Sequence, residues 1–289
     1  MAAVTPTYSA LAVAEPVRPF FEASQGSGRV LAAFPRSCYV ETQEGQLIAV
    51  LAESLGRGAF ALTVAGEPSF AWLQTDDSVL VADQVLELGP LRIGLGSAAP
   101  WDPTLPAFDG PPADGMRVLG TYLRANAPAE GLSRILLDIP GAPAATPLDR
   151  AGGALDRLRA GLIQGDASAV TSAATDLAGF GPGLTPSGDD VLAGILLALG
   201  LWPQAAGPLG AKVVSTLIVG AAAPRTGRIS RAYLWAARRG HAAEAWHDLV
   251  RALPTDLDGV IAAASRILQT GETSGADMLA GFVFAWQRP

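Results

Sequence analysis

Short runs in which apolar and polar residues alternate fill the first third of the chain. They cover residues 29–34, 38–42, 47–53, 60–64, 69–73, 78–81 and 91–95, and turn residues such as Glu44-Gly45 separate them. Alternation with a period of two is typical of β-strands that bury one face. We therefore expect a β-rich domain over residues 28–98, an antiparallel sheet or small barrel, after an N-terminal extension over residues 1–27.

Prolines then interrupt the pattern. Five of them lie between residues 99 and 114, and a second proline-rich piece covers residues 140–147. Proline lacks a backbone N–H and holds the preceding residue in an extended conformation. We expect residues 99–114 to form a linker.

The remainder of the chain has helical periodicity. Leu155, Leu158 and Leu162 lie on one helical face, and similar spacing recurs after Leu249. We expect a helical domain over residues 115–289, with about six helices after residue 149. The predicted fold class is thus α+β, with an N-terminal antiparallel β domain followed by a C-terminal multi-helix domain.

Composition and charge indicate which kinds of partner the chain is not expected to bind. Hydrophobic residues make up 49% of the chain and charged residues 16%, which is enough apolar surface for a large core. The net charge of −7 gives no basic surface for nucleic acid. The apolar run 191–202 is shorter than the ~20 residues of a membrane span. Residues 1–14 lack the pattern of a signal peptide, so we expect a cytoplasmic protein with neither a nucleic-acid nor a membrane partner.

An internal repeat lies within the helical part. Residues 187–194, Ser-Gly-Asp-Asp-Val-Leu-Ala-Gly, match residues 274–281, Ser-Gly-Ala-Asp-Met-Leu-Ala-Gly, and an apolar helix follows each copy. We call these two segments the helix-start repeats. A duplicated unit at the beginning of a helix is the simplest interpretation.

Each repeat alone could be a helix cap. Ser187 with Asp190 and Ser274 with Asp277 have the spacing of a capping box. Thr185 could equally be the N-cap, with Pro186 at the first helical position. A protein whose repeats are only caps, and which acts as a scaffold, remains one of the interpretations.

Two features exceed what a cap requires. Gly179, Gly181 and Gly183 alternate before the first repeat, and glycines there let backbone N–H groups approach an anion. Asp189 adds a second carboxylate beside Asp190, and we expect these two as catalytic residues. Mg²⁺ is a possible cofactor with Asp189 as ligand, because it would reconcile carboxylates with an anionic substrate.

Further candidates for binding a small anion follow from the same reasoning. Arg228 and Ser230 lie in a third turn before a helix, where an arginine could pair with a carboxylate or phosphate, although a solvated helix start is an equally good interpretation. The complete set of expected substrate-binding residues is Gly181, Gly183, Thr185, Ser187, Gly188, Arg228, Ser230, Thr273, Ser274, Gly275 and Asp277.

The first repeat with its glycines, the segment 226–240 and the closing segment 271–281 together resemble the AllH-like family. This former family of unknown function includes a subunit associated with oxamate carbamoyltransferase in allantoin degradation. The resemblance implies that the chain helps to transfer a carbamoyl group between oxalurate and phosphate, giving oxamate and carbamoyl phosphate. It also implies further subunits of the same enzyme as partners.

Two hypotheses on function stay open beside the scaffold. The chain is either an enzyme subunit in which Asp189 or Asp190 acts as base or metal ligand, or a non-catalytic anion-binding or assembly subunit. We predict that Asp189 is the more functional and Asp190 the more structural of the two, because Asp190 has a counterpart in Asp277 whereas Asp189 is replaced by Ala276. We also predict that the two helix starts face each other across a shared anion site.

Overall fold

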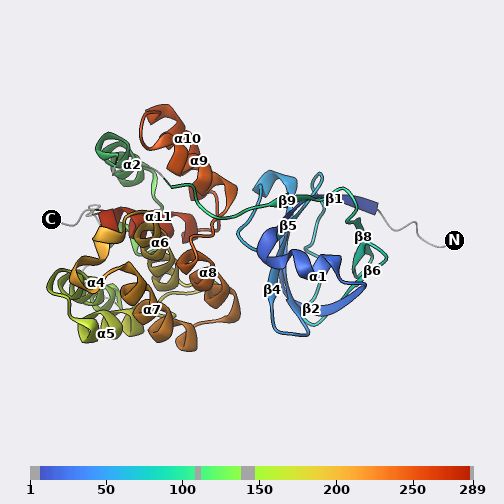
Figure 1. Cartoon of the computed structure of the whole chain (residues 1–289), viewed down its shortest axis with the longest axis horizontal. Coiled ribbons are helices and arrows are strands. Elements are labelled where there is room, and N and C mark those ends of the chain that lie inside the picture. The colour runs from blue at the N-terminus through green and yellow to red at the C-terminus, as the bar shows by residue number, and fades with distance from the viewer. Residues whose placement is uncertain (1–6, 108–111, 138–146, 287–289) are drawn as a thin grey trace. The chain divides into compact units, whose positions relative to one another are not determined.

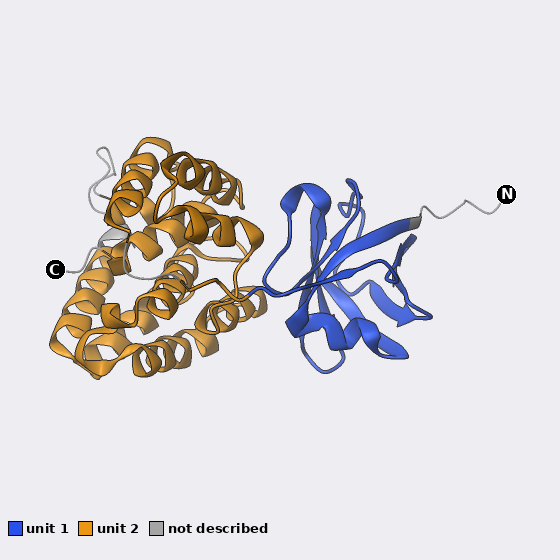
Figure 2. Cartoon of the chain, turned by 45° about the horizontal axis from the view of Figure 1, so that its top comes forward, with its two compact units in different colours: residues 1–103 blue, residues 104–289 orange. Residues whose placement is uncertain are grey.

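The chain forms two compact units, residues 1–103 and residues 104–289, coloured separately in Figure 2. The computed structural model describes residues 7–107, 112–137 and 147–286. Each unit has its own secondary structure, β-strands in the first and helices in the second (Figure 1). The predicted class, β-rich and then helical, is confirmed.

Unit 1 is a closed barrel. The sheet order β5-β4-β3-β2-β6-β7-β8-β1 returns to its beginning because β1 also pairs with β5, while β9 is added beside β1. Closure removes the open edges that would otherwise expose unpaired backbone groups. The strands are β1 Thr7–Ala14, β2 Gln25–Phe34, β3 Ser37–Thr42, β4 Leu47–Ala52, β5 Ala61–Val64, β6 Ser78–Ala82, β7 Val85–Leu88, β8 Leu91–Gly94 and β9 Ala99–Trp101.

Alternating side chains fill this barrel. In β3 the buried positions are Cys38, Val40 and Thr42, and β6 buries Val79 and Val81, as the period of two predicts. The pairing is mixed and not purely antiparallel, because β1 runs parallel to β8 and β9, and β4 runs parallel to β5. Strand direction depends on which distant segments pair, and alternation does not encode that.

Several strands differ from those expected. β1 lies within residues 1–27, which we expected to be an extension, and β9 lies within the expected linker. The alanines of β1 give weak alternation, and Pro100 in β9 is an unusual strand residue. β7 was not predicted, and residues 69–73 form no strand. The short helices of unit 1 are η1 Glu15–Val17, α1 Arg18–Glu22 and η2 Glu53–Leu55.

Unit 2 contains ten α-helices within its described residues, and the last eight of them lie in the part of the chain where about six were expected. They are α2 Ala113–Asn126, α3 Ser133–Leu136, α4 Pro147–Gln164, α5 Ala167–Leu177, α6 Ser187–Leu201, α7 Ala211–Ala222, α8 Arg228–Arg238, α9 Glu244–Ala252, α10 Leu257–Leu268 and α11 Ser274–Trp286. The 3-10 turns are η3 Pro203–Leu209 and η4 Ala223–Arg225. Most of the proline-rich piece 140–147 lies outside the described residues.

Helix α6 is the centre of unit 2. It is buried from Ser187 to Leu199, and α11 packs along it. Phe282 of α11 contacts the rings of Trp202 and Trp246 at the same core. A helix buried all round needs no amphipathic pattern, which explains its continuous apolar sequence.

The apolar helices were also compared with the length of a membrane span. Within the described part of the chain, no single helix is long and apolar enough to cross a membrane. Among the described helices, one pair, α6 with η3, is long and apolar enough when taken together, but the chain bends by 98° between them.

Candidate functional site

The two helix-start repeats meet at the first turns of α6 and α11. The Thr185 Oγ1 and Ser274 Oγ atoms are 2.8 Å apart. The Ser274 hydroxyl bonds the carboxyl group of Asp190, and the Ser187 hydroxyl bonds that of Asp277. The serine of each repeat therefore bonds the aspartate of the other repeat, and the arrangement is reciprocal.

These bonds between the repeats take the place of the helix caps that the sequence suggested. The N-cap of α6 is Pro186, with no capping bond from a side chain, so Thr185 is not the N-cap and Pro186 is not the first helical residue. Among the described residues, each aspartate bonds the serine of the other repeat and not the serine of its own. The first-turn hydroxyl groups instead connect α6 to α11.

Asp190 and Asp277 are a buried pair of carboxyl groups. They are 4% and 0% exposed, and the Oδ2 atom of each has no hydrogen-bond partner among the described residues. Burial raises the pKa of Asp190 well above its usual range, against the bond from Ser274, and the charges of Asp277 and Asp189 raise it further. Burial raises the pKa of Asp277 to about 6. Burial thus shifts the ionisation of both carboxyl groups to higher pH.

Asp277 has a second set of partners, which the sequence did not reveal. Its Oδ1 accepts the backbone N–H of Ser133 at 2.7 Å, and the N–H of Leu132 and the hydroxyl of Thr273 also bond the carboxyl group. A Cβ on Gly131 would lie 2.8 Å from both of its oxygens. Asp277 therefore also holds the start of α3, and no pattern near Gly131 indicates such a contact.

Asp189 points to a different set of groups. Its Oδ1 accepts the N–H of Gly179 at 3.0 Å, its Oδ2 accepts the hydroxyl of Thr226, and Ser230 bonds it as well. Burial raises the pKa of Asp189, and these three bonds lower it. Asp189 thus joins the turn before α6 to the start of α8.

The residues 179–185, which we call the glycine loop, lie between these helix starts. Residues 181–184 are exposed, and Gly181 and Gly183 have φ values of 112° and 91° that other residues rarely adopt. The Ser230 hydroxyl donates to the carbonyl of Leu184 at 3.3 Å, which places the start of α8 beside the loop. The first turns of α6, α8 and α11 are therefore all within contact of one short segment.

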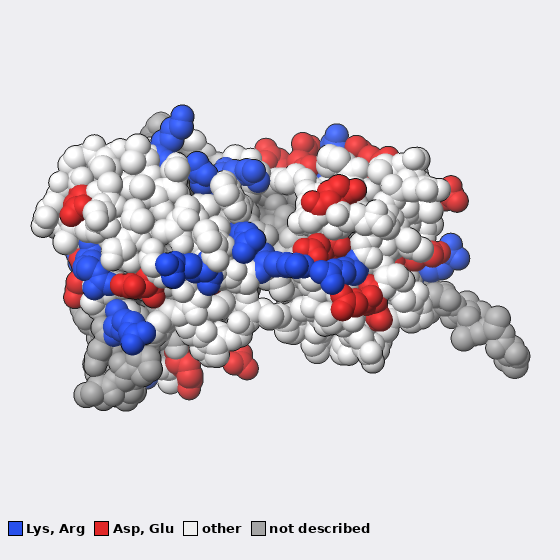
Figure 3. Space-filling model, turned by 90° about the horizontal axis from the view of Figure 1, so that it is seen from below, with Lys and Arg blue, Asp and Glu red and all other residues white. Residues whose placement is uncertain are grey.

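The other expected binding residues divide into two groups. Gly188 and Gly275 are buried, and a Cβ on either would lie 1.9 Å from a carbonyl oxygen, of Leu177 and Ile267 respectively, so both serve close packing. Arg228 is exposed at the first turn of α8. Figure 3 shows several Lys and Arg side chains on the surface of unit 2.

The contacts of Asp189 do not fit a metal ion. Both of its oxygens accept hydrogen bonds from protein donors, and these donors already surround the carboxylate to which Mg²⁺ would have to bind. Within the described ranges, no group of three or more His, Cys, Asp and Glu side chains could hold a metal.

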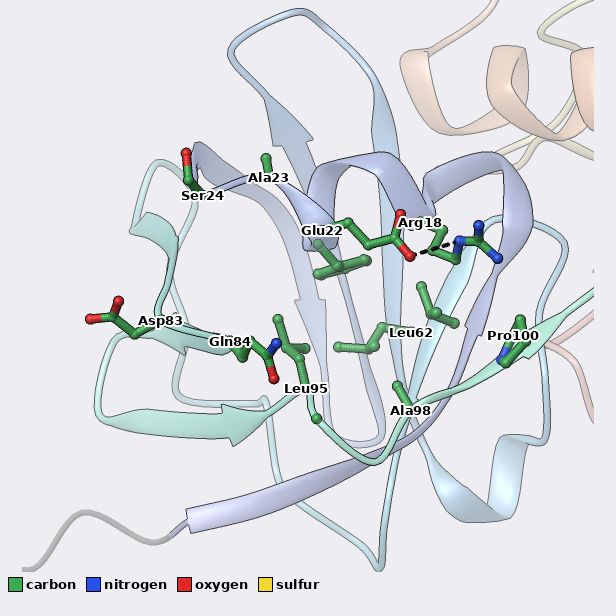
Figure 4. Close-up of a pocket in the computed structure, with 13 residues that line it drawn as sticks. Arg18, Glu22, Ala23, Ser24, Leu62, Asp83, Gln84, Leu95, Ala98 and Pro100 are labelled. Atoms are coloured by element: carbon green, nitrogen blue, oxygen red, sulfur yellow. Dashed lines mark ion pairs between the residues drawn. The ribbon is translucent and has the colours of Figure 1, made fainter.

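Unit 1 contains a cavity of about 530 Å³, shown in Figure 4. None of the expected site residues lines it. Arg18 at its rim pairs with Glu22 at 3.0 Å, and both side chains are largely exposed. This cavity offers no buried polar group that would select a ligand.

The site thus belongs to a helical unit built around a duplicated helix start. Residues 177–286, which contain both repeats and α8, match the family model described as oxamate carbamoyltransferase subunit AllH. The resemblance noted in the sequence is confirmed for this segment. Comparisons with curated proteins and with solved structures gave no match.

Proposed function

We propose that the chain is a subunit of a carbamoyltransferase that binds a small anion, such as oxamate, phosphate or carbamoyl phosphate, at the glycine loop. The observation that carries the proposal is that the family match covers the residues whose helix starts meet there. As the resemblance implies, the reaction belongs to the cytoplasmic breakdown of allantoin, and other subunits of the enzyme are the partners.

The backbone of the loop supports anion binding. The N–H groups of Gly181, Gly183 and Leu184 donate to no acceptor among the described residues, and neither does the N–H of Ser187 at the first turn of α6. Free N–H groups at a helix N-terminus attract anions through their partial positive charge. Arg228 adds a cation at the neighbouring helix start.

The chemistry makes use of such donors. A phosphate oxygen attacks the carbamoyl carbon of oxalurate and a tetrahedral oxyanion forms. The bond from this carbon to the amide nitrogen then breaks, and oxamate leaves after its nitrogen takes up a proton. Donors aimed at the oxyanion lower the barrier, typically by ~3 kcal/mol for each donor. The loop and Arg228 would supply that stabilisation.

The alternative is an anion-binding or assembly subunit without catalytic residues of its own. It is favoured by Asp189, whose two oxygens both accept hydrogen bonds that join α6 to neighbouring segments and so have a structural role. Formation of carbamoyl phosphate by the purified chain would exclude this alternative. Activity that needs added subunits, together with binding to the chain alone, would favour it.

Calorimetric titration of the full chain with oxamate, and separately with phosphate, tests the binding site. Arg228→Ala should weaken oxamate binding about tenfold, since a charge-assisted hydrogen bond contributes ~1.5–3 kcal/mol. Arg117→Ala is the matched control, because Arg117 is an exposed arginine of α2 paired with Asp114. No binding by the unmodified chain, or equal losses in both variants, would contradict the proposal.

A further inference from the structure

Two hydroxyl groups connect the exposed glycine loop to a buried carboxyl group. Thr185 lies at the end of the loop and is half-buried, and its hydroxyl is 2.8 Å from that of Ser274. Ser274 in turn bonds Asp190, which is 4% exposed. The Oδ2 atom of Asp190 has no partner among the described residues. A continuous path of hydrogen bonds therefore leads from the proposed anion site into the core.

We propose that Thr185, Ser274 and Asp190 form a proton relay, which donates a hydrogen bond to an anion bound at the glycine loop and passes a proton to it. The relay rests on the proposed anion site. Thr185 is the group that touches the ligand, while Ser274 and Asp190 act through it.

The relay has two states, because either hydroxyl can be the donor between Thr185 and Ser274. When Asp190 is protonated, its proton bonds Ser274, Ser274 donates to Thr185, and Thr185 donates outward. When Asp190 is ionised, every donor points inward and the Thr185 oxygen can only accept. An anion bound against Thr185 therefore favours the protonated state.

The same path supplies the proton that the reaction consumes. Thr185 gives its proton to the leaving amide nitrogen, takes one from Ser274, and Ser274 takes one from Asp190. One N–H bond forms and one O–H bond of Asp190 is lost, so that Asp190 ends as a carboxylate. Solvent restores its proton after the products leave.

The groups around Asp190 favour its protonated form. The charged groups facing it are Asp277 on α11 and its neighbour Asp189 on α6, and both are acidic. Burial and these two charges raise the pKa of Asp190, so its neutral form persists to higher pH than that of an ordinary aspartate.

The second repeat lacks this connection. Ser187 bonds Asp277 in the same way, but the residue that corresponds to Thr185 is the exposed Glu272. Asp277 instead accepts backbone N–H groups at the start of α3. The two buried carboxyl groups thus have different roles despite their reciprocal serines.

Oxamate titrations of the full chain in buffers of different ionisation enthalpy test the relay. Oxamate is the probe because its carboxylate stays ionised across the pH range used. Binding of one oxamate should be accompanied by the uptake of at most about one proton. This uptake should be largest at pH values between the pKa of Asp190 in the free chain and its pKa in the oxamate complex. Thr185→Val and Ser274→Ala should abolish this uptake, whereas Thr185→Ser and Ser274→Thr, which keep the hydroxyl, should retain it.

Thr171→Val is the matched control, since the Thr171 hydroxyl bonds only the carbonyl of Ala167 on its own helix among the described residues. It should leave proton uptake unchanged. Binding without proton uptake, or uptake that persists in Thr185→Val, would overturn the relay but not the anion site. No oxamate binding by the unmodified chain would count against the proposed function and would remove the relay with it.

Discussion

Gly194 of α6 lies directly against the backbone of Met278 in α11, so closely that a Cβ on Gly194 would be 1.9 Å from the Met278 carbonyl oxygen. The reciprocal contact exists between Gly281 and Val191, at 2.2 Å. Gly194 and Gly281 hold the same position in the two repeats, as do Val191 and Met278. Helices α6 and α11 therefore cross at Gly194 and Gly281, the last glycine of each repeat.

This crossing predicts a large effect of a single methyl group. Gly194→Ala should destabilise the protein by about 2 kcal/mol or more, because the backbones of both helices must separate. Gly200→Ala, on the exposed part of the same helix with no atom near its Cβ position, should be neutral or stabilising. Urea unfolding of both variants measures the difference, and equal stabilities would contradict the close contact.

Asp189 is predicted to be important for stability, in contrast to the expectation from the repeat. Asp189→Ala leaves the donors of Gly179 and Thr226 without their acceptor, which should cost about 1–3 kcal/mol. Asp176→Ala, which removes a partly exposed ion pair with Arg157, should cost under about 1 kcal/mol. Thermal unfolding distinguishes them. If Asp189→Ala has the same melting temperature as the unmodified chain but does not bind oxamate, Asp189 has the functional role that the repeat suggested.

The stability of the chain should depend on the ionisation of Asp277. Its pKa is about 6 in the folded state against 3.8 when unfolded, so the folded state binds more protons between these values. The resulting stabilisation is present below pH 4 and is lost as pH rises through 6, by about 3 kcal/mol. An asparagine side chain does not ionise, so Asp277→Asn should not lose this stabilisation. The free energy of unfolding of the variant minus that of the unmodified chain should therefore increase from pH 4 to pH 7. A constant difference in the free energy of unfolding would contradict the raised pKa.

Unit 2 is predicted to fold and bind on its own. Residues 104–289 have a separate core and contain every residue of the proposed site. This fragment should unfold in a single cooperative transition and bind oxamate with the Kd of the full chain. A folded fragment that does not bind, while the full chain does, would show that unit 1 contributes to the site.

Local patterns in the sequence determined where secondary structure begins. Helices α6 and α11 start at Ser187 and Ser274, as the repeat predicts, because a small polar residue before an apolar run is a local signal. Strands such as β3 and β4 follow the alternation for the same reason. The strand β1 was missed, since its alanines alternate weakly and its partners β5 and β8 are more than 45 residues away.

Only the tertiary structure decided which groups bond to one another. Ser187 and Asp190 have the spacing of a cap, yet Ser187 bonds Asp277 and Asp190 bonds Ser274. The close crossing at Gly194 and Gly281 brings the two first turns together, and a hydroxyl then finds its acceptor on the other helix. The sequence by itself determined that two helices begin alike. The packing of α6 on α11 decided that their first turns bond to each other, because hydrogen-bond partners depend on distance in space and not on spacing along the chain.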